Sequence, residues 1–494
     1  MANVDLSAST EMAPGFGQYV PPCKERSRVY KLAVEVISYF KPPEKVSLIF
    51  RKILQITGIS KLVAKVSSLY ERLIGYRYRR TLSPQDGEWN LKKAAYPKLG
   101  ETTKAHVKLI TNSKESHDWK KRLILSAESS IELSPNFAGG ENFQEILTLI
   151  EFRMKEKKEL QVHILCSKDL LTAEDTALLK KLEKTYSSQF HFLISDRIIC
   201  VGGGEFRAEE NHVKLLLVDE KYFFTGGTGI HSKMNRHDPE DKTGREKDKT
   251  MGARVLPVAN RDMDVIGRGE IAKTLRVEFF NLYKIWNYRT TGKEAPSRYE
   301  PVKGDQGKCD ELEKDPKFYQ DVNFKAFVSG PEHNGNNSIS NAFADLIQTA
   351  KKTVYLSSLI FMPGKKMSEA MLTKKGEGVK IVASLNGPAL RVNVVPFRKY
   401  YQFCTKVYEY NKPAGIHRKV LVVDKSKLAI GTYNLSTKSE YYDHEIAVVI
   451  EDPKIAKEAV EAIKKDIKDS KKYSQKGLLG KVNHIIPDIL GRVR

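Results

Sequence analysis

Short apolar runs alternate with longer segments of helical periodicity in the first part of this chain. Runs of apolar and β-branched residues predict strands at 107–111, 131–134 and 160–166. Helical patterns lie between and after these runs, near 142–156 and 172–186. Strands that alternate with helices of this length are typical of a layered α/β fold.

The alternation returns further along the chain. The elements predicted there are strands at 324–329, 354–359 and 379–384 and a helix near 337–351. The segment AESSIELS, which ends at Ser134, has the same pattern as AKKTVYLS, which ends at Ser357. Residues 291–320, between the two parts, are charged and contain Pro and Gly, which is a linker composition. The sequence therefore predicts two similar α/β lobes in tandem.

One motif occurs in both lobes with identical spacing. H-x-K-(x)4-D is found as His212, Lys214 and Asp219 and again as His417, Lys419 and Asp424. The residues between Lys and Asp, LLLV and VLVV, predict a buried strand, and the period-2 geometry of a strand puts His and Lys on one face. A glycine stands seven residues past each Asp. An imidazole beside an ammonium group, presented twice in one chain, indicates a site for phosphate.

The duplicated motif resembles the signature of the phospholipase D superfamily, in which each H-x-K-(x)4-D is followed by a G-(G/S)-x-N type turn. The resemblance covers roughly residues 105–452 and includes further matching residues, which are 261–265, Phe279, Phe280, Trp286, Asn287, Lys438, Ser439 and 443–445. It implies two α/β/α sandwich lobes that form a pseudo-dimer around one active site. A single chain would then suffice for catalysis.

The resemblance also implies a reaction and a role for each residue. Lys214 and Lys419 would neutralise the non-bridging oxygens of a phosphodiester, as the chemistry of this anionic group requires. His212 would attack phosphorus to form a phosphohistidine, and His417 would protonate the leaving oxygen and then activate water or an alcohol. Asp262 would orient the first of these rings and Glu445 the second.

The glycine turns would supply further contacts. By the resemblance, Asn434, Thr432 and Gly227 would bind phosphate oxygens, whereas Asp219 and Asp424 would be structural supports at strand ends. No metal or other cofactor is expected, because two lysines already supply the positive charge. The chain departs from the pattern at Gly229, where Asn or Asp is expected. His231 or Asn235, at the start of the charged insertion 231–260, could substitute for the missing polar group.

Charge is distributed unevenly, and this bears on the substrate. The formal net charge is +22, of which residues 24–96 carry +10 and residues 454–494 carry +6. These flanks also have the periodicity of amphipathic helices, including an aliphatic stripe at 478–493. Nucleic-acid enzymes need their positive charge along the channel that holds the backbone. The distribution therefore favours a phospholipid substrate on an anionic membrane surface, with a nuclease or a weakly active lipid-binding protein as alternatives.

The sequence divides into six regions on these grounds. They are a disordered tail at 1–23, a basic helical region at 24–96, the first lobe at 97–290, a linker at 291–320, the second lobe at 321–453 and basic amphipathic helices at 454–494. The composition, with 40% hydrophobic and 29% charged residues, excludes a disordered or collagen-like chain. Five widely spaced cysteines without a CxxC suggest neither a disulfide framework nor a zinc cluster.

The N-terminus and the hydropathy pattern bear on location. The first 22 residues lack the basic start and the continuous apolar stretch of a signal peptide, and no uncharged apolar run approaches 18 residues. We therefore expect a cytoplasmic or peripheral membrane protein. Secretion by a route that reads a polar, Ser/Thr-rich N-terminus stays open.

Overall fold

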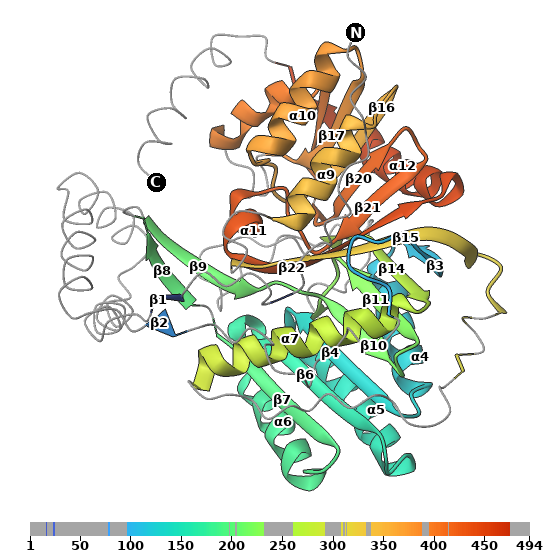
Figure 1. The fold of residues 1–494 in the computed structure, drawn as a ribbon, viewed down its shortest axis with the longest axis vertical. Coiled ribbons are helices and arrows are strands. Elements are labelled where there is room, and N and C mark those ends of the chain that lie inside the picture. The colour runs from blue at the N-terminus through green and yellow to red at the C-terminus, as the bar shows by residue number, and fades with distance from the viewer. Residues whose placement is uncertain are drawn as a thin grey trace.

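The computed structural model describes most of the region from residue 96 to residue 474. The described residues are 16, 23–24, 78–79, 96–231 (without 197, 203 and 204), 260–291, 308–331 (without 310, 311 and 313), 337–387 and 395–474 (without 413). They form an α/β fold in two halves, which Figure 1 shows one above the other. Most of the basic region 24–96, most of the insertion 231–260, including Asn235, and the stripe 478–493 lie outside the described residues.

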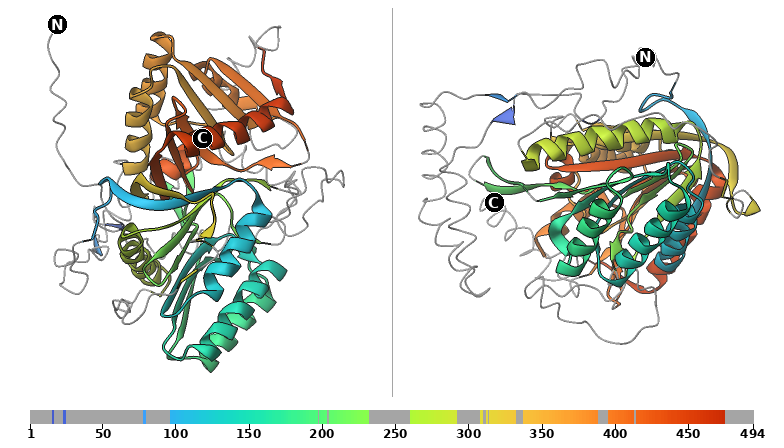
Figure 2. Two further views of the ribbon diagram at one scale, coloured as in Figure 1. Left: turned by 90° about the vertical axis from the view of Figure 1, so that its right-hand side faces the viewer. Right: turned by 90° about the horizontal axis from the view of Figure 1, so that it is seen from below.

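The first half has a sheet with helices on both faces. Its strands lie in the order β7 (Phe190–Ser195), β6 (Gln161–Ser167), β4 (Ser130–Asn136), β10 (Leu215–Val218), β11 (Tyr222–Gly226), β14 (Asp264–Arg268) and β3 (Thr103–Ile110). The helices are α4 (Ser113–Leu125), α5 (Glu141–Glu156), α6 (Ala173–Thr185) and α7 (Ile271–Thr291). Figure 2 shows α7 on one face of the sheet and the other three on the opposite face.

The second half repeats this strand order. It runs β18 (Lys406–Tyr410), β17 (Lys380–Asn386), β16 (Thr353–Ser358), β20 (Lys419–Val423), β21 (Lys427–Gly431), β22 (Asp443–Glu451) and β15 (Tyr319–Ser329). The helices are α9 (Ser338–Gln348), α10 (Lys365–Gly376), α11 (Thr437–Tyr441) and α12 (Pro453–Lys468). Strand β15 pairs with β3 and so joins the two sheets. The predicted α/β fold is confirmed.

The predicted correspondence between the two apolar segments holds in the sheet register. Ser134 on β4 lies opposite Leu215, and Ser357 on β16 lies opposite Val420. Each of these partners stands three residues after the histidine of its motif. The two motifs therefore occupy the same position in their halves.

The aspartates that end the two motifs act alike. Asp219 and Asp424 both have a positive φ, at 57° and 50°, in the turn that follows the motif strand. The Asp219 carboxylate accepts hydrogen bonds from the backbone N–H groups of residues 128–130. The Asp424 carboxylate accepts three from residues 351–353. Each carboxylate closes the turn before the neighbouring strand, and neither lies near the motif histidine.

Three features differ from the sequence expectation. Phe16, within the expected disordered tail, is 1% exposed, and its backbone N–H donates to the Glu278 carboxylate at 2.6 Å. In the expected linker, Cys309, Leu312 and Phe318 are buried against the first-half core. Helix α12, at the start of the expected membrane-binding flank, buries its apolar face in a core that it shares with α7 and strands of both halves. The apolar face of α12 therefore packs against the rest of the protein.

Among the helices of the described residues, none is both long enough and apolar enough to cross a bilayer.

Candidate active site

The two HxK motifs meet at the boundary between the halves because each pairs with backbone of the other half. The His212 N–H donates to the His444 carbonyl at 3.0 Å, and the His417 N–H donates to the Arg261 carbonyl at 3.0 Å. The strand that ends just before each histidine pairs in parallel with a strand of the other half. These pairs are β9 (Glu205–Asn211) with β22, and β19 (Gly415–Ile416) with β13 (Asn260–Arg261). The residue after each accepting carbonyl is an acid, Glu445 or Asp262.

Each histidine contacts the acid of the opposite half. His212 Nδ1 lies 2.9 Å from Glu445 Oε2, and His417 Nδ1 lies 2.7 Å from Asp262 Oδ2. The sequence expectation paired His212 with Asp262 and His417 with Glu445, and that pairing is wrong. The halves face one another, so the end of each acidic strand lies beside the motif of its partner. Both carboxylates anchor Nδ1 and leave Nε2 as the ring nitrogen for chemistry.

The two motif lysines are buried beside their histidines. The Lys214 Nζ donates to the His212 carbonyl and to Asn136 Oδ1, both at 3.0 Å. The Lys419 Nζ donates to the His417 carbonyl at 2.5 Å and lies 3.2 Å from His417 Nε2. Burial lowers the pKa of Lys214 to about 7, aided by Lys419, and lowers the pKa of Lys419 to about 8. Two buried cations so close together favour an anionic ligand.

The two histidines differ electrostatically. Burial and the ammonium groups of Lys214 and Lys419 hold the pKa of His212 well below its usual value. Burial and Lys419 also lower the pKa of His417, but Asp262 opposes them. Although burial opposes its ionisation, Asp262 has its pKa lowered to about 2 by His417 and the two lysines. Burial instead raises the pKa of Glu445 well above its usual value. His212 is therefore the more readily neutral imidazole, and His417 has the stronger anionic partner.

Two of the expected phosphate contacts in the glycine turns are not formed as predicted. The Thr432 hydroxyl is buried and donates to Glu445 Oε2 at 2.5 Å, so Thr432 holds the carboxylate rather than facing a ligand. The Gly227 N–H donates to the Met263 carbonyl at 3.1 Å. A Cβ at Gly227 would lie 1.8 Å from Asp262 Oδ1, so close packing explains this glycine. The Asn434 side chain is buried, and its Oδ1 has no hydrogen-bond partner among the described residues.

The glycine that departs from the pattern has a steric explanation. A Cβ at Gly229 would lie 2.6 Å from the carbonyl oxygen of Phe137. The Phe137 ring lies 6.1 Å from the His212 ring, centroid to centroid, and 5.4 Å from Lys214 Nζ. The backbone after β4 therefore leaves no room for the expected Asn. His231, expected as a substitute, is buried on β12 (Ile230–His231), which pairs with the same loop.

Sequence reasoning missed Asn136, Phe137 and Lys120, and it matched Asp264 without giving it a role. Asn136, with φ of 48°, binds Lys214 through Oδ1 and donates from Nδ2 to the Asn211 carbonyl. Its neighbour Phe137 flanks His212. Asp264 and Lys120 are buried beneath the first glycine turn. Two features of the sequence could have pointed to these residues: Asn136-Phe137 begins two positions after the end of the predicted strand 131–134, and Asp264 stands two residues past Asp262.

Lys438, matched by the resemblance, lies between the halves. Its Nζ contacts Glu210 at 2.9 Å and Asp443 at 2.5 Å. Despite burial, these two acids raise the pKa of Lys438. The contact ties β9 of the first half to the strand that carries Glu445.

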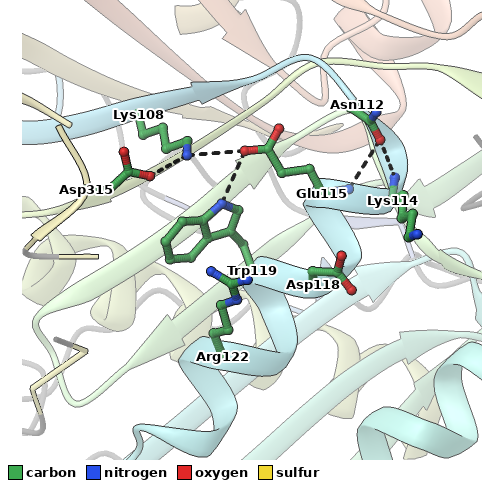
Figure 3. A pocket seen from close by; sticks show the side chains of 8 residues that line it. All are labelled: Lys108, Asn112, Lys114, Glu115, Asp118, Trp119, Arg122 and Asp315. Atoms are coloured by element: carbon green, nitrogen blue, oxygen red, sulfur yellow. Dashed lines mark hydrogen bonds and ion pairs between the residues drawn. The ribbon is translucent and has the colours of Figure 1, made fainter. Parts of the chain in front are cut away.

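A separate cavity lies beside the N-terminus of α4. Figure 3 shows this cavity of about 280 Å³, lined by Lys108, Asn112, Lys114, Glu115, Asp118, Trp119, Arg122 and Asp315. Lys108 Nζ contacts Asp315 at 2.5 Å and Glu115 at 3.2 Å, so the central charges pair with one another. The HxK cluster, in which two buried histidines lie beside two buried lysines, is the better candidate for an active site. Within the described residues, His, Cys, Asp and Glu form no group of three or more that could hold a metal ion.

Comparison with known proteins gives consistent matches. Residues 343–467 match a family described as "Cardiolipin synthase, PLD-like domain". A cardiolipin synthase of Alkalihalophilus pseudofirmus is 25% identical over 48% of this chain and 42% of its own length. One from Clostridium perfringens is 26% identical over 52% of this chain and 49% of its own. The chain thus spans less than half the length of these curated relatives.

A solved structure with a similar fold supports the architecture. The phosphatidylserine synthase of Haemophilus influenzae Rd KW20 aligns with a TM-score of 0.51 and 14% sequence identity. The alignment covers 79% of this chain and 94% of that protein. At this identity the likeness concerns the fold alone.

Proposed function

We propose that this chain is a member of the phospholipase D superfamily, to which its similarities point, and that it hydrolyses or transfers phosphatidyl groups of membrane phospholipids through a phosphohistidine intermediate. The observation that supports this most is the crossed arrangement of His212 with Glu445 and His417 with Asp262 around two buried lysines. Each half supplies one histidine and the acid for the other. The proposed site therefore needs both halves of one chain and no second copy.

In the first step, the Nε2 lone pair of His212 attacks phosphorus. Its low pKa keeps this imidazole neutral, and Glu445 accepts the Nδ1–H as positive charge develops on the ring. The bond from phosphorus to the leaving oxygen breaks, and His417 donates its Nε2 proton to that oxygen. The products are an alcohol and a phosphatidyl group on His212.

In the second step, the roles of the rings reverse. Neutral His417 accepts a proton from water or from an acceptor alcohol, whose oxygen attacks phosphorus. The bond from phosphorus to His212 breaks, and the imidazole returns to its starting state. Water yields phosphatidic acid, and an alcohol yields a new phosphatidyl ester.

The positive charge of the site acts throughout. Lys214 and Lys419 would face the non-bridging oxygens, and the Asn434 side chain would add a hydrogen bond. Phosphate binding would raise the pKa of both lysines by supplying the negative charge that the free site lacks. Since two ammonium groups provide this charge, we expect chelators to leave turnover unchanged.

The relatives and the sequence flanks support a lipid setting. The matched relatives are named cardiolipin synthases. The excess positive charge lies mainly at 24–96 and 454–494, outside the proposed site. We therefore propose a phospholipid substrate, peripheral association with an anionic membrane surface and a single chain as the catalytic unit. The basic region, the two lobes and the terminal helices remain part of this proposal. The disordered tail and the linker do not extend over Phe16, Cys309, Leu312 and Phe318, which are buried.

The test is product analysis on mixed phospholipid vesicles, with and without added glycerol. We expect phosphatidic acid without glycerol and a new phosphatidyl ester with it, and loss of both products in His212→Ala and His417→Ala. His106→Ala, a substitution on β3 outside the site, is the matched control and should keep turnover. Cleavage of DNA by the wild type, without reaction on vesicles, would instead support the nuclease alternative.

A further inference from the structure

Glu445 and Asp262, whose carboxylates contact the two histidines, differ in the residues that fix them in place. Glu445 receives a hydrogen bond from the Thr432 hydroxyl at 2.5 Å. The first-half position that corresponds to Thr432 is Gly227, which has no side chain to offer. Asp262 Oδ1, the oxygen that faces this glycine, has no hydrogen-bond partner among the described residues. Something else must keep Asp262 against His417.

A buried lysine lies beneath this part of the first half. Lys120 on α4 is 4% exposed, and its Nζ donates to Ser116 Oγ at 2.9 Å and to the Thr228 carbonyl at 3.3 Å. Asp264, 1% exposed, accepts the Thr228 N–H at 3.0 Å. Residue 228 is therefore clamped through its backbone between a buried cation and a buried anion.

The clamp fixes the glycine turn on which Asp262 rests. Thr228 directly follows Gly226 and Gly227, whose missing side chains allow contact with Asp264 and Asp262, respectively. A shift of this turn would remove the surface against which Asp262 packs. Burial lowers the pKa of Lys120 to about 8, and the nearby Asp264 and Asp262 oppose that shift, which agrees with a cation close to both acids.

At the corresponding positions, the second half has uncharged residues. The residue that corresponds to Lys120, seven positions before the matched Ala127 and Ala350, is Phe343. Thr228 corresponds to Tyr433, and Asp264, which pairs with Gly226, corresponds to Ala447, which pairs with Gly431. The Phe343 and Tyr433 rings lie 5.7 Å apart. The fold thus accommodates apolar residues here, and buried charges usually cost stability relative to apolar ones.

We propose that Lys120 is a positioning residue: it holds the turn at Thr228 and thereby keeps Asp262 in place beside His417. In the second half, the Thr432 hydroxyl keeps Glu445 in place directly. The inference rests on the proposed function, in which His417 is the proton donor. Without the clamp, Asp262 would lose its fixed contact with His417 Nδ1, and the ring would lose both its orientation and its anionic partner.

The predicted defect is specific to proton donation, so the leaving group reveals it. Lys120→Met should lower phosphatidyl turnover about tenfold to a hundredfold, because a misplaced general acid loses only part of the roughly 10²–10⁴-fold that general acid catalysis contributes. Turnover of a p-nitrophenyl phosphodiester, whose leaving group needs no proton, should fall less than about threefold. Thr432→Val, which loosens Glu445 and the nucleophile, should slow both substrates equally. Equal losses in Lys120→Met, or no loss, would overturn the proposal.

A second readout does not depend on turnover. His417 faces Asp262, Lys419, Lys214 and His212, and only Asp262 among them raises its pKa. NMR titration should therefore show a lower pKa for His417 in Lys120→Met and a wild-type value in Lys120→Arg. An unchanged or raised value in Lys120→Met would refute the role of Lys120 even if lipid turnover were never observed. Failure of the wild type on lipid, with the shift present, would refute only the proposed substrate.

Folding of the variant is addressed by a double substitution. Lys120→Met with Asp264→Ala removes both charges and imitates the apolar arrangement of the second half. The double variant should fold and show the same selective loss on the lipid substrate. Full lipid turnover in the folded double variant would contradict the inference.

Discussion

The two halves of this protein share a strand order but support their acids in different ways. In the second half, a threonine hydroxyl contacts Glu445 directly, and the packing beneath the turn is aromatic. In the first half, a glycine meets Asp262, and a buried lysine and aspartate hold the turn. The pKa of Asp262 is lowered to about 2, whereas burial raises that of Glu445. The two halves therefore place their acids in different electrostatic environments. This difference suits the proposed roles of His212 as nucleophile and His417 as general acid.

The largest expected effect separates the two histidines. His212→Ala should lower phosphatidyl turnover by about 10³-fold or more, because no covalent intermediate can form. His417→Ala should lose as much on phospholipid but retain measurable turnover of a p-nitrophenyl phosphodiester, which needs no proton at its leaving oxygen. Steady-state assays on the two substrates check this. Substantial activity of His212→Ala on the activated substrate would reverse the assignment.

A smaller effect is expected from the support of Glu445. Thr432→Val removes a buried hydrogen bond and leaves an oxygen of Glu445 short of a partner, at a cost of about 1–3 kcal/mol, so turnover should fall about fivefold to a hundredfold. Thr432→Ser keeps the hydroxyl and is the matched control. If Thr432→Val and Thr432→Ser had equal activity, the hydroxyl would not be what holds the carboxylate.

The buried lysines predict a pH dependence of anion binding. In the free site the pKa of Lys214 is about 7 and that of Lys419 about 8, and a bound phosphodiester should raise both. Binding is then accompanied by proton uptake, so affinity should fall as pH rises from about 7 to 9, by up to about tenfold per unit for each proton. The inhibition constant of a dialkyl phosphate, whose own charge is constant in this range, measures this. A constant value over the range would show that both lysines stay charged in the free site.

The smallest effect on turnover is expected at the motif aspartates. Asp219→Asn and Asp424→Asn each weaken a turn held by three backbone N–H groups. Each should lower the free energy of unfolding by about 1–3 kcal/mol, more for the fully buried Asp219 than for the partly exposed Asp424. Denaturant unfolding measures the loss. Activity below the unfolding range should stay near wild type, and a catalytic loss there would give these acids a direct role.

Much of this arrangement could be predicted from the sequence because it is repeated. Two copies of H-x-K-(x)4-D located both motif strands, and the segments ending at Ser134 and Ser357 revealed the shared register. The acids Asp262 and Glu445 were also found. Their crossed pairing was not, because spacing within a half says nothing about which strand end lies across the boundary between halves.

Other features depended on tertiary packing that no local pattern carries. Thr432 appears in a glycine turn typical of phosphate contacts, yet its hydroxyl is taken by Glu445. Helix α12 lies in the basic flank that was expected to bind a membrane, yet its apolar face packs on strands of both halves. No sequence pattern singles out Lys120, and only the fold places its ammonium group beneath the turn at Thr228.

The central claim is that the two halves form one site in which His212 carries the covalent intermediate. The most direct measurement is mass spectrometric mapping of the phosphorylated residue after quenching a reaction with a p-nitrophenyl phosphodiester. The His417→Ala variant, which should hydrolyse the intermediate slowly, is the protein to use. We predict a phosphoryl adduct on His212 and none in the His212→Ala and His417→Ala double variant. An adduct on another residue, or turnover by His212→Ala at the wild-type rate, would contradict the account.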